Sequence, residues 1–223
     1  MTKALIFKEW IKTRWYLLVC LTVMIGFAAY AASGVFRAVE LRGAGHIWEV
    51  MVTRDAIFVD ILRYVPLAAG FALAIVQFVP EMQKKCLKLT LHLPCSILKT
   101  TAVMIAYGLC CLTICFMAMS LTGILPLGRL FPHEMVSRIF LSMLPWILGG
   151  YSAYIFTSWI IIEPSWKMRI AYIAISALAL RIFFLAPGPE AYNVFLPWLS
   201  AAVIFSASLI WLSVLRFKAG VQD

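Results

Sequence analysis

The residues that could carry out acid–base chemistry are too scattered in this sequence to form a catalytic set. Its three histidines, His46, His92 and His133, each fall in a polar connection between apolar segments. An enzyme acting at membrane depth needs histidines, carboxylates or a serine–histidine pair there, but the ten acidic residues also lie at the ends of apolar segments. The sequence lacks the G-x-x-x-x-G-K loop that cradles phosphates. We therefore predict neither a catalytic site nor ATP binding through that loop.

Sulfur-containing side chains are the second group that could take part in chemistry, and they gather in one apolar segment. Cys110, Cys111, Cys115, Met117 and Met119 lie close together there, and Cu(I) prefers thiolate and thioether ligands. Cysteine and methionine are also common apolar side chains of membrane helices, and we assign them that role. The six cysteines show neither a disulfide framework nor zinc-ligand spacing. The sequence predicts no metal site and no bound cofactor.

Arg181 is the one charge well inside an apolar segment. It lies about five residues from the segment end, roughly 8 Å deep by helix rise. A charge at that depth indicates a function, such as contact with an anionic substrate or an ion pair, although arginine can also reach the headgroups with its long side chain. The pair Gly149-Gly150 allows a second helix to come close, and packing is its expected role. The proline-rich stretch 183–197 is compatible with a re-entrant segment or a plain loop.

The composition of the chain indicates that its apolar segments are membrane helices. Hydrophobic residues make up 64% of the chain and charged residues 13%, with a mean hydropathy of +0.96, whereas a soluble domain carries about a quarter charged residues. Apolar runs of the roughly 20 residues needed to cross a bilayer recur along the whole length. We predict an all-α polytopic membrane protein with a single transmembrane domain, residues 1–223. Six spans are expected, at about 16–36, 61–79, 100–125, 139–162, 170–186 and 194–215.

Residues 1–15 predict an amphipathic helix that precedes the first span. At helical spacing, one arc is apolar and the opposite arc is charged. A basic amphipathic helix that contains tryptophan is suited to lie flat at the membrane interface, although an ordinary basic flank of the first span is the alternative. The apolar arc consists of Ile6, Phe7, Trp10 and Ile11, and the charged arc of Lys8, Glu9 and Lys12.

A second amphipathic helix is predicted in the basic connection 81–99, between the second and third spans. Pro94 ends this helix because it lacks a donor, and Ser96 can cap the next helix. Such a helix offers a soluble partner a surface to bind. Its polar face carries Lys84, Lys85, Lys88 and His92, and its apolar face carries Met82, Cys86, Leu89 and Leu93.

The distribution of Lys and Arg predicts the orientation in the membrane. One side carries the N-terminus, the connections 81–99 and 163–169, and the C-terminal tail, and it holds about twice as many Lys and Arg as the other side. The positive-inside rule places this side in the cytoplasm, with both termini. The net charge of +9 therefore reflects topology, and no nucleic-acid-binding motif accompanies it.

These features resemble the permease subunit of a type-2 ABC transporter. The resemblance rests on Phe7-Lys8-Glu9 in a basic N-terminal helix, six spans, and a cytoplasmic basic loop. In the loop it is carried by Glu81, Leu91-His92-Leu93-Pro94, Ser96 and Lys99. It covers residues 1–105 and rests on hydropathy beyond them.

The resemblance implies that the loop docks on a separate ATPase subunit, present in two copies, which holds ATP and magnesium. The docking residues would be Glu81, Lys84, Lys85, Lys88, Leu89, Leu93 and Pro94, and the interfacial "elbow" helix would present Phe7, Glu9, Trp10 and Ile11. A second permease, identical or paralogous, would meet this chain along a seam or substrate path that contains Gly26, Gly70 and Arg181.

The implied function is ATP-driven transport by alternating access in a bacterial cytoplasmic membrane, with export as the expected direction. Two alternatives remain open. One is a non-transporting membrane anchor or assembly subunit, and the other is a polytopic membrane enzyme. The sequence does not identify the cargo.

Overall fold

The computed structural model describes residues 2–43, 45, 49–50, 59–83, 96–186 and 188–218. The elements within these ranges are all helical. They are α1 (Thr2–Arg42), the short 3₁₀ helix η1 (Asp60–Leu62), α3 (Val65–Gln83), α5 (Ile97–Ile124), the 3₁₀ helix η2 (Leu127–Arg129), α6 (His133–Ile162), α7 (Trp166–Ile182) and α8 (Leu196–Lys218).

Five of the described helical segments are long and apolar enough to cross a membrane, as expected of an integral membrane protein. They contain α1, α3, α5, α6 and α8, and these helices overlap the residues predicted as spans at 16–36, 61–79, 100–125, 139–162 and 194–215. The remaining predicted span, 170–186, coincides largely with α7, which has 17 residues. Its rise of about 26 Å is slightly less than the roughly 30 Å of a hydrocarbon core.

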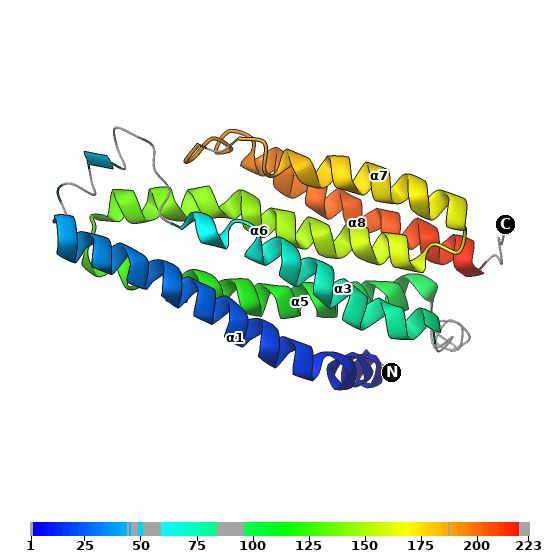
Figure 1. The fold of residues 1–223 in the computed structure, drawn as a ribbon. Helices are drawn as coiled ribbons and strands as arrows, with labels where there is room; N and C mark the ends of the chain where they lie inside the picture. The colour runs from blue at the N-terminus through cyan, green and yellow to red at the C-terminus, as the bar shows by residue number, and fades with distance from the viewer. Residues whose placement is uncertain are drawn as a thin grey trace.

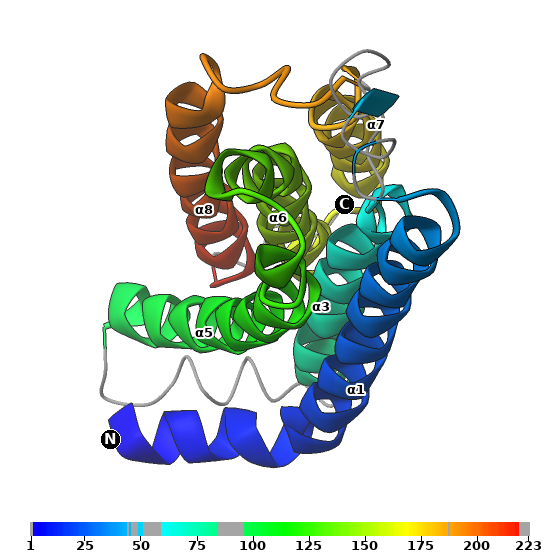
Figure 2. The same cartoon turned by 90° about the vertical axis from the view of Figure 1, so that its left-hand side faces the viewer.

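The N-terminal part of α1 turns away from the axis of the bundle. Thr2–Arg42 is helical throughout, but Figure 2 shows the N-terminal part crossing the direction of the rest, and Figure 1 shows it nearly end-on. Near the turn, the Thr13 hydroxyl donates to the carbonyl oxygen of Glu9 at 3.0 Å, a bond that often bends helices. The prediction of a separate helix at 1–15 is therefore corrected in one respect: helical structure continues through the turn into the first span.

Two closely packed helix pairs make up most of the bundle. α1 packs mainly on α5, and α3 packs mainly on α6, which is the most deeply buried of the five long helices. Figure 2 shows α6 between α8 and the other helices, with α7 on the outside. The core between these helices includes Met24, Phe78, Met119 and Tyr154, all buried. The start of α1, the end of α3 and the end of α8 lie at one end of the bundle (Figure 1).

Glycines explain why α3 and α6 pack so closely. A Cβ atom on Gly70 would lie 2.0 Å from the carbonyl oxygen of Gly150, and one on Gly150 would lie 2.7 Å from the carbonyl oxygen of Pro66. Only glycine permits this approach, because a side chain on either residue would meet backbone. The packing role predicted for Gly149-Gly150 is confirmed at Gly150.

A buried carboxylate fixes the outer pair α7 and α8 to α6. Glu163 follows α6 directly and is fully buried. Its Oε2 accepts a hydrogen bond from the Ser213 hydroxyl at 2.6 Å, its Oε1 lies 3.3 Å from Arg216 Nη1, and its carbonyl oxygen accepts a bond from Arg169 Nε at 2.6 Å. This residue therefore joins the end of α6 to the start of α7 and the end of α8.

Residues 183–186 and 188–195 form turns and bends between α7 and α8 at the opposite end of the bundle (Figure 1). Tyr192 stabilises this connection, because its hydroxyl donates to the carbonyl oxygen of Ile182 at 2.6 Å and accepts from the amide of Ala186 at 3.0 Å. The amide of Glu190 donates to the Ser142 hydroxyl on α6 at 3.1 Å. The connection is thus held by hydrogen bonds to its own ends and to α6.

Candidate functional site

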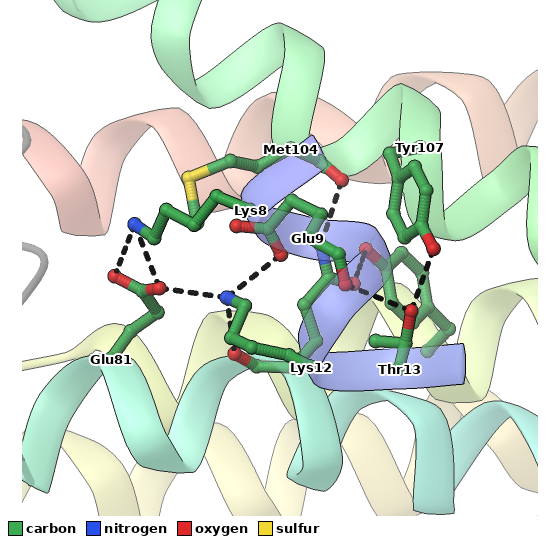
Figure 3. A network of polar contacts seen from close by, with 9 residues as sticks. Lys8, Glu9, Lys12, Thr13, Glu81, Met104 and Tyr107 are labelled. Atoms are coloured by element: carbon green, nitrogen blue, oxygen red, sulfur yellow. Dashed lines mark hydrogen bonds and ion pairs between the residues drawn. The ribbon is translucent and has the colours of Figure 1, made fainter. Parts of the chain in front are cut away.

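The candidate site is the polar cluster between the N-terminal part of α1 and the end of α3. It includes all three charged residues of the amphipathic arc predicted for 1–15 (Figure 3). This arc faces the bundle, whereas the apolar arc faces outward, with Phe7 63%, Trp10 45% and Ile11 48% exposed. A helix in water would do the reverse, so this orientation fits a segment whose outer face contacts lipid.

Glu81 is the centre of the cluster. It lies near the C-terminal end of α3 and is only 1% exposed. Lys8 Nζ lies 2.8 Å from its Oε1 and donates to its Oε2 at 3.0 Å. Lys12 Nζ donates to the same Oε1 at 2.7 Å. Two cations from the N-terminal segment therefore bind one buried carboxylate of the second span.

Lys12 also neutralises a second buried carboxylate, that of Glu9. Its Nζ lies 2.8 Å from Glu9 Oε2 and donates to the carbonyl oxygen of Gln77 at 3.3 Å. Glu9 is fully buried, and neither of its carboxylate oxygens accepts a hydrogen bond from the part of the chain described. Its charge therefore depends on Lys12. Two lysines balance two carboxylates, so the cluster is formally neutral.

Hydrogen bonds extend the cluster from the N-terminal segment to α5. Thr13 uses its own proton for the carbonyl oxygen of Glu9, so it accepts a hydrogen bond from the Tyr107 hydroxyl at 2.6 Å. On α3, the Gln77 side chain donates through Nε2 to the carbonyl oxygen of Met104 at 2.9 Å. These bonds fix α5 to both α1 and α3 close to the ion pairs.

A further hydrogen bond reaches α6. The fully buried Tyr154 hydroxyl donates to Gln77 Oε1 at 2.9 Å. Gly108 makes room for this contact, because a Cβ atom there would lie 2.1 Å from the Tyr154 hydroxyl oxygen. Gln77 thus uses its carbonyl and amide groups to connect α3 with α6 and α5. Buried networks of this kind fix one arrangement when their members are paired.

The arrangement is suited to fixing the position of helices rather than to bond chemistry. Its charges neutralise one another, and its polar side chains mostly bond to neighbouring helices. Within the described ranges, no group of three or more His, Cys, Asp or Glu side chains is placed to hold a metal ion. The cluster therefore positions the end of α3, where the basic connection 81–99 begins.

Most of the predicted docking residues cannot be compared with the structure. Lys84, Lys85, Lys88, Leu89, Leu93 and Pro94 lie outside the described residues. Glu81 is described; it is buried and bound by two lysines, so its carboxylate is not exposed to a docking partner in this structure. Ser96 does cap α5 as predicted, because its hydroxyl accepts a hydrogen bond from the Lys99 amide at 3.3 Å.

The predicted seam residues fall in two different environments. Gly26 and Arg181 are exposed, on α1 and α7. Gly70 is buried in the contact with Gly150 of the same chain, so in this structure it packs within one bundle. The structure does not bring these three residues together on one surface.

The sequence-based prediction missed the pairing of Lys8 and Lys12 with Glu81, and the roles of Gln77 and Tyr154. One signal was available: two lysines one helical turn apart, and an acidic residue at the end of the second span. A glutamine within an apolar helix was a second signal, because an intramembrane amide needs partners.

Two apolar hollows open beside α5. One, of about 610 Å³, lies between α5 and α8, and Leu98, Ile105, Leu109 and Trp211 contribute to its lining. The other, of about 400 Å³, lies between α5 and α6 near Leu121. Neither is lined by an acidic residue, lysine or arginine, so both are suited to lipid tails rather than to a charged ligand.

Comparison with known protein families, curated proteins and solved structures found no match to this chain.

Proposed function

We propose that this chain is the membrane-spanning permease subunit of an ATP-driven ABC transporter, and that it works as an exporter. α7 acts as the fifth of six spans, and both termini lie in the cytoplasm. A separate ATPase subunit, in two copies, docks on the connection around residues 82–94 and holds ATP and magnesium. Its ATP-driven closure moves two permease bundles against each other, so that the substrate path opens alternately to either side of a bacterial cytoplasmic membrane.

The observation that carries this proposal is the ion-pair cluster at the start of that connection. Lys8 and Lys12 hold the buried Glu81 carboxylate at 2.8 and 2.7 Å, two residues before α3 ends. A docking loop can transmit force only if its base is fixed to the helices that must move. The cluster, with Gln77 and Tyr107, connects this base to α1, α5 and α6.

The substrate path is proposed to form between two permeases rather than within one. The hollows beside α5 are apolar and open toward the surface. α7 is exposed along most of its length, with Ser176 its one buried residue. Gly26 on α1 and Arg181 on α7 are also exposed, and an arginine is less costly beside a shared wet path than in lipid. The second bundle is an identical copy or a paralogue.

Co-purification with an ABC-type ATPase tests the proposal. Wild-type chain purified from its native membrane should retain an ABC-type ATPase, and replacement of both Leu89 and Leu93 by Asp should abolish this retention. The matched control carries the same change at two exposed leucines, Leu41→Asp and Leu185→Asp, far from the loop in sequence. This control should retain the ATPase. Folding of each variant is checked by size-exclusion chromatography in detergent.

The outcomes separate the alternatives. Retention of the ATPase by the folded Leu89→Asp, Leu93→Asp variant would exclude the loop as docking site. A wild-type chain that binds no ATPase, but co-purifies with other membrane subunits, would instead identify an assembly or anchoring subunit.

A further inference from the structure

The ion-pair cluster joins two segments that are far apart in the sequence and lie at the same end of the bundle. Lys8, Glu9 and Lys12 belong to the part of α1 that crosses the bundle axis, whereas Glu81 ends the second span (Figures 2 and 3). Along the chain, the rest of α1 and most of α3 separate them. The ion pairs, together with the hydrogen bond that Thr13 accepts from Tyr107, therefore help to set the position of the N-terminal segment relative to the start of the basic connection.

The electrostatics make this link strong in one arrangement and weak in others. Glu9 and Glu81 are both nearly inaccessible, and Lys12 lies between them within 2.8 Å of each carboxylate. If α3 shifted away from α1, Lys12 could not stay in contact with both carboxylates. Leaving a buried charge without its partner is strongly unfavourable. The two segments should therefore move together.

We propose that the Lys8–Lys12–Glu81 ion pairs make the N-terminal segment follow the end of α3 when a partner pulls on the basic connection. Glu81 is thus a positioning residue that transmits motion, and not a contact for the partner. This inference rests on the proposed function, because the pull comes from the ATPase. The test below separates a failure of the link from a failure of docking.

The test follows the N-terminal segment with a fluorescent probe at position 7. Phe7 is exposed, so Phe7→Cys can be labelled without disturbing the cluster. The background carries Cys86→Ser, Cys95→Ser and Cys110→Ser, which leaves Cys20, Cys111 and Cys115, all buried. The measured quantity is the change in probe emission when ATP and vanadate are added to the permease–ATPase complex in nanodiscs.

Three variants test the charges. Glu81→Lys places three lysines beside Glu9, and the probe response should fall at least fivefold. The double variant Lys12→Glu, Glu81→Lys again has two cations and two carboxylates in the cluster, and should recover most of the response. Glu81→Gln removes the charge with little change in size, and should also reduce the response. Lys3→Glu changes an exposed charge on the same segment and should leave the response unchanged.

The results separate a failure of the ion-pair link from a failure of ATPase docking. If wild-type chain retains no ATPase, the proposed function fails. If the ATPase stays bound and Glu81→Lys or Glu81→Gln gives the full response, the inference is wrong while the proposed function stands. Loss of response without recovery in the double variant would also overturn it, because pairing of charges would not be the cause. If neither single variant folds, the cluster is a requirement for folding and the inference is likewise wrong.

Discussion

Replacing Gly70 by alanine tests the closest approach between helices in this bundle. A Cβ atom at this position would lie 2.0 Å from the carbonyl oxygen of Gly150 and 3.2 Å from the amide nitrogen of Tyr154. Both are backbone atoms, so neither can rotate away as the end of a side chain can. A carbon atom in van der Waals contact, without a hydrogen bond, prefers a separation of about 3.5 Å. α3 would therefore have to move away from α6 by about 1.5 Å at this point.

The cost of this movement follows from what the two helices bury between them. Phe78 on α3 lies against Tyr154 on α6, with ring centroids 6.2 Å apart. A gap of about 0.5–1 Å already removes a quarter to a half of the dispersion energy of a contact. Overpacking of a core costs about 1–3 kcal/mol. We expect the upper part of this range for Gly70→Ala, because backbone meets backbone.

Gly26→Ala is the matched control, because a Cβ atom at Gly26 has no neighbour within 4 Å. Alanine is the better helix former by about 1 kcal/mol, so this variant should be as stable as wild type or more stable. The assay heats detergent-solubilised protein and measures the monodisperse fraction by fluorescence-detected size exclusion. Gly70→Ala should lower the apparent midpoint. A wild-type midpoint in Gly70→Ala, or an equal decrease in Gly26→Ala, would refute the close-packing argument.

Two further predictions concern the ends of the bundle. Glu163→Ala should lower stability by about 1–3 kcal/mol, because Ser213 and Arg216 lose a buried acceptor. The same heating assay measures this loss. An unchanged midpoint would mean that α7 and α8 do not depend on this contact. For topology, a cysteine at Thr2 should be protected from an impermeant thiol reagent in intact cells, whereas one at Gly45 should be labelled. The reason is that the excess of Lys and Arg places the N-terminus inside. The reverse labelling pattern would invert the proposed orientation and remove the loop 82–94 from the cytoplasm.

The helices and their approximate ends could be predicted from the sequence, because they depend on local properties. Apolar runs of sufficient length fix where spans lie, and five of the described helices follow them. Ser96 was predicted as a cap from its residue type and its place after Pro94, and its hydroxyl accepts the Lys99 amide. Such features involve residues within a few positions of each other, so helix periodicity is enough to find them.

The partners of polar residues could not be predicted in the same way. The resemblance to the permease family places Glu81 on a docking face, but in the structure Lys8, 73 positions earlier, binds it. The same resemblance places Gly70 at a seam between bundles, but in the structure its contact is with Gly150. A small residue or a charge in a span shows that some partner is required. Only the packing of the helices shows which partner it is.

Two of the buried carboxylates, Glu81 near the end of α3 and Glu163 after the end of α6, have related roles. Glu81 is paired with cationic side chains of the N-terminal segment, and Glu163 is paired with one cationic side chain and one hydroxyl group from the end of α8. In both cases a segment on the outside of the bundle is attached to an inner helix through charge, whereas α3 and α6 are attached to each other through glycine contacts. Close apolar packing leaves little room for sliding, because any shift creates either overlap or a gap. A lysine shared by two buried carboxylates likewise keeps both ion pairs in only one arrangement. Movement driven from the basic connection should therefore carry α3, α6 and the N-terminal segment as one unit.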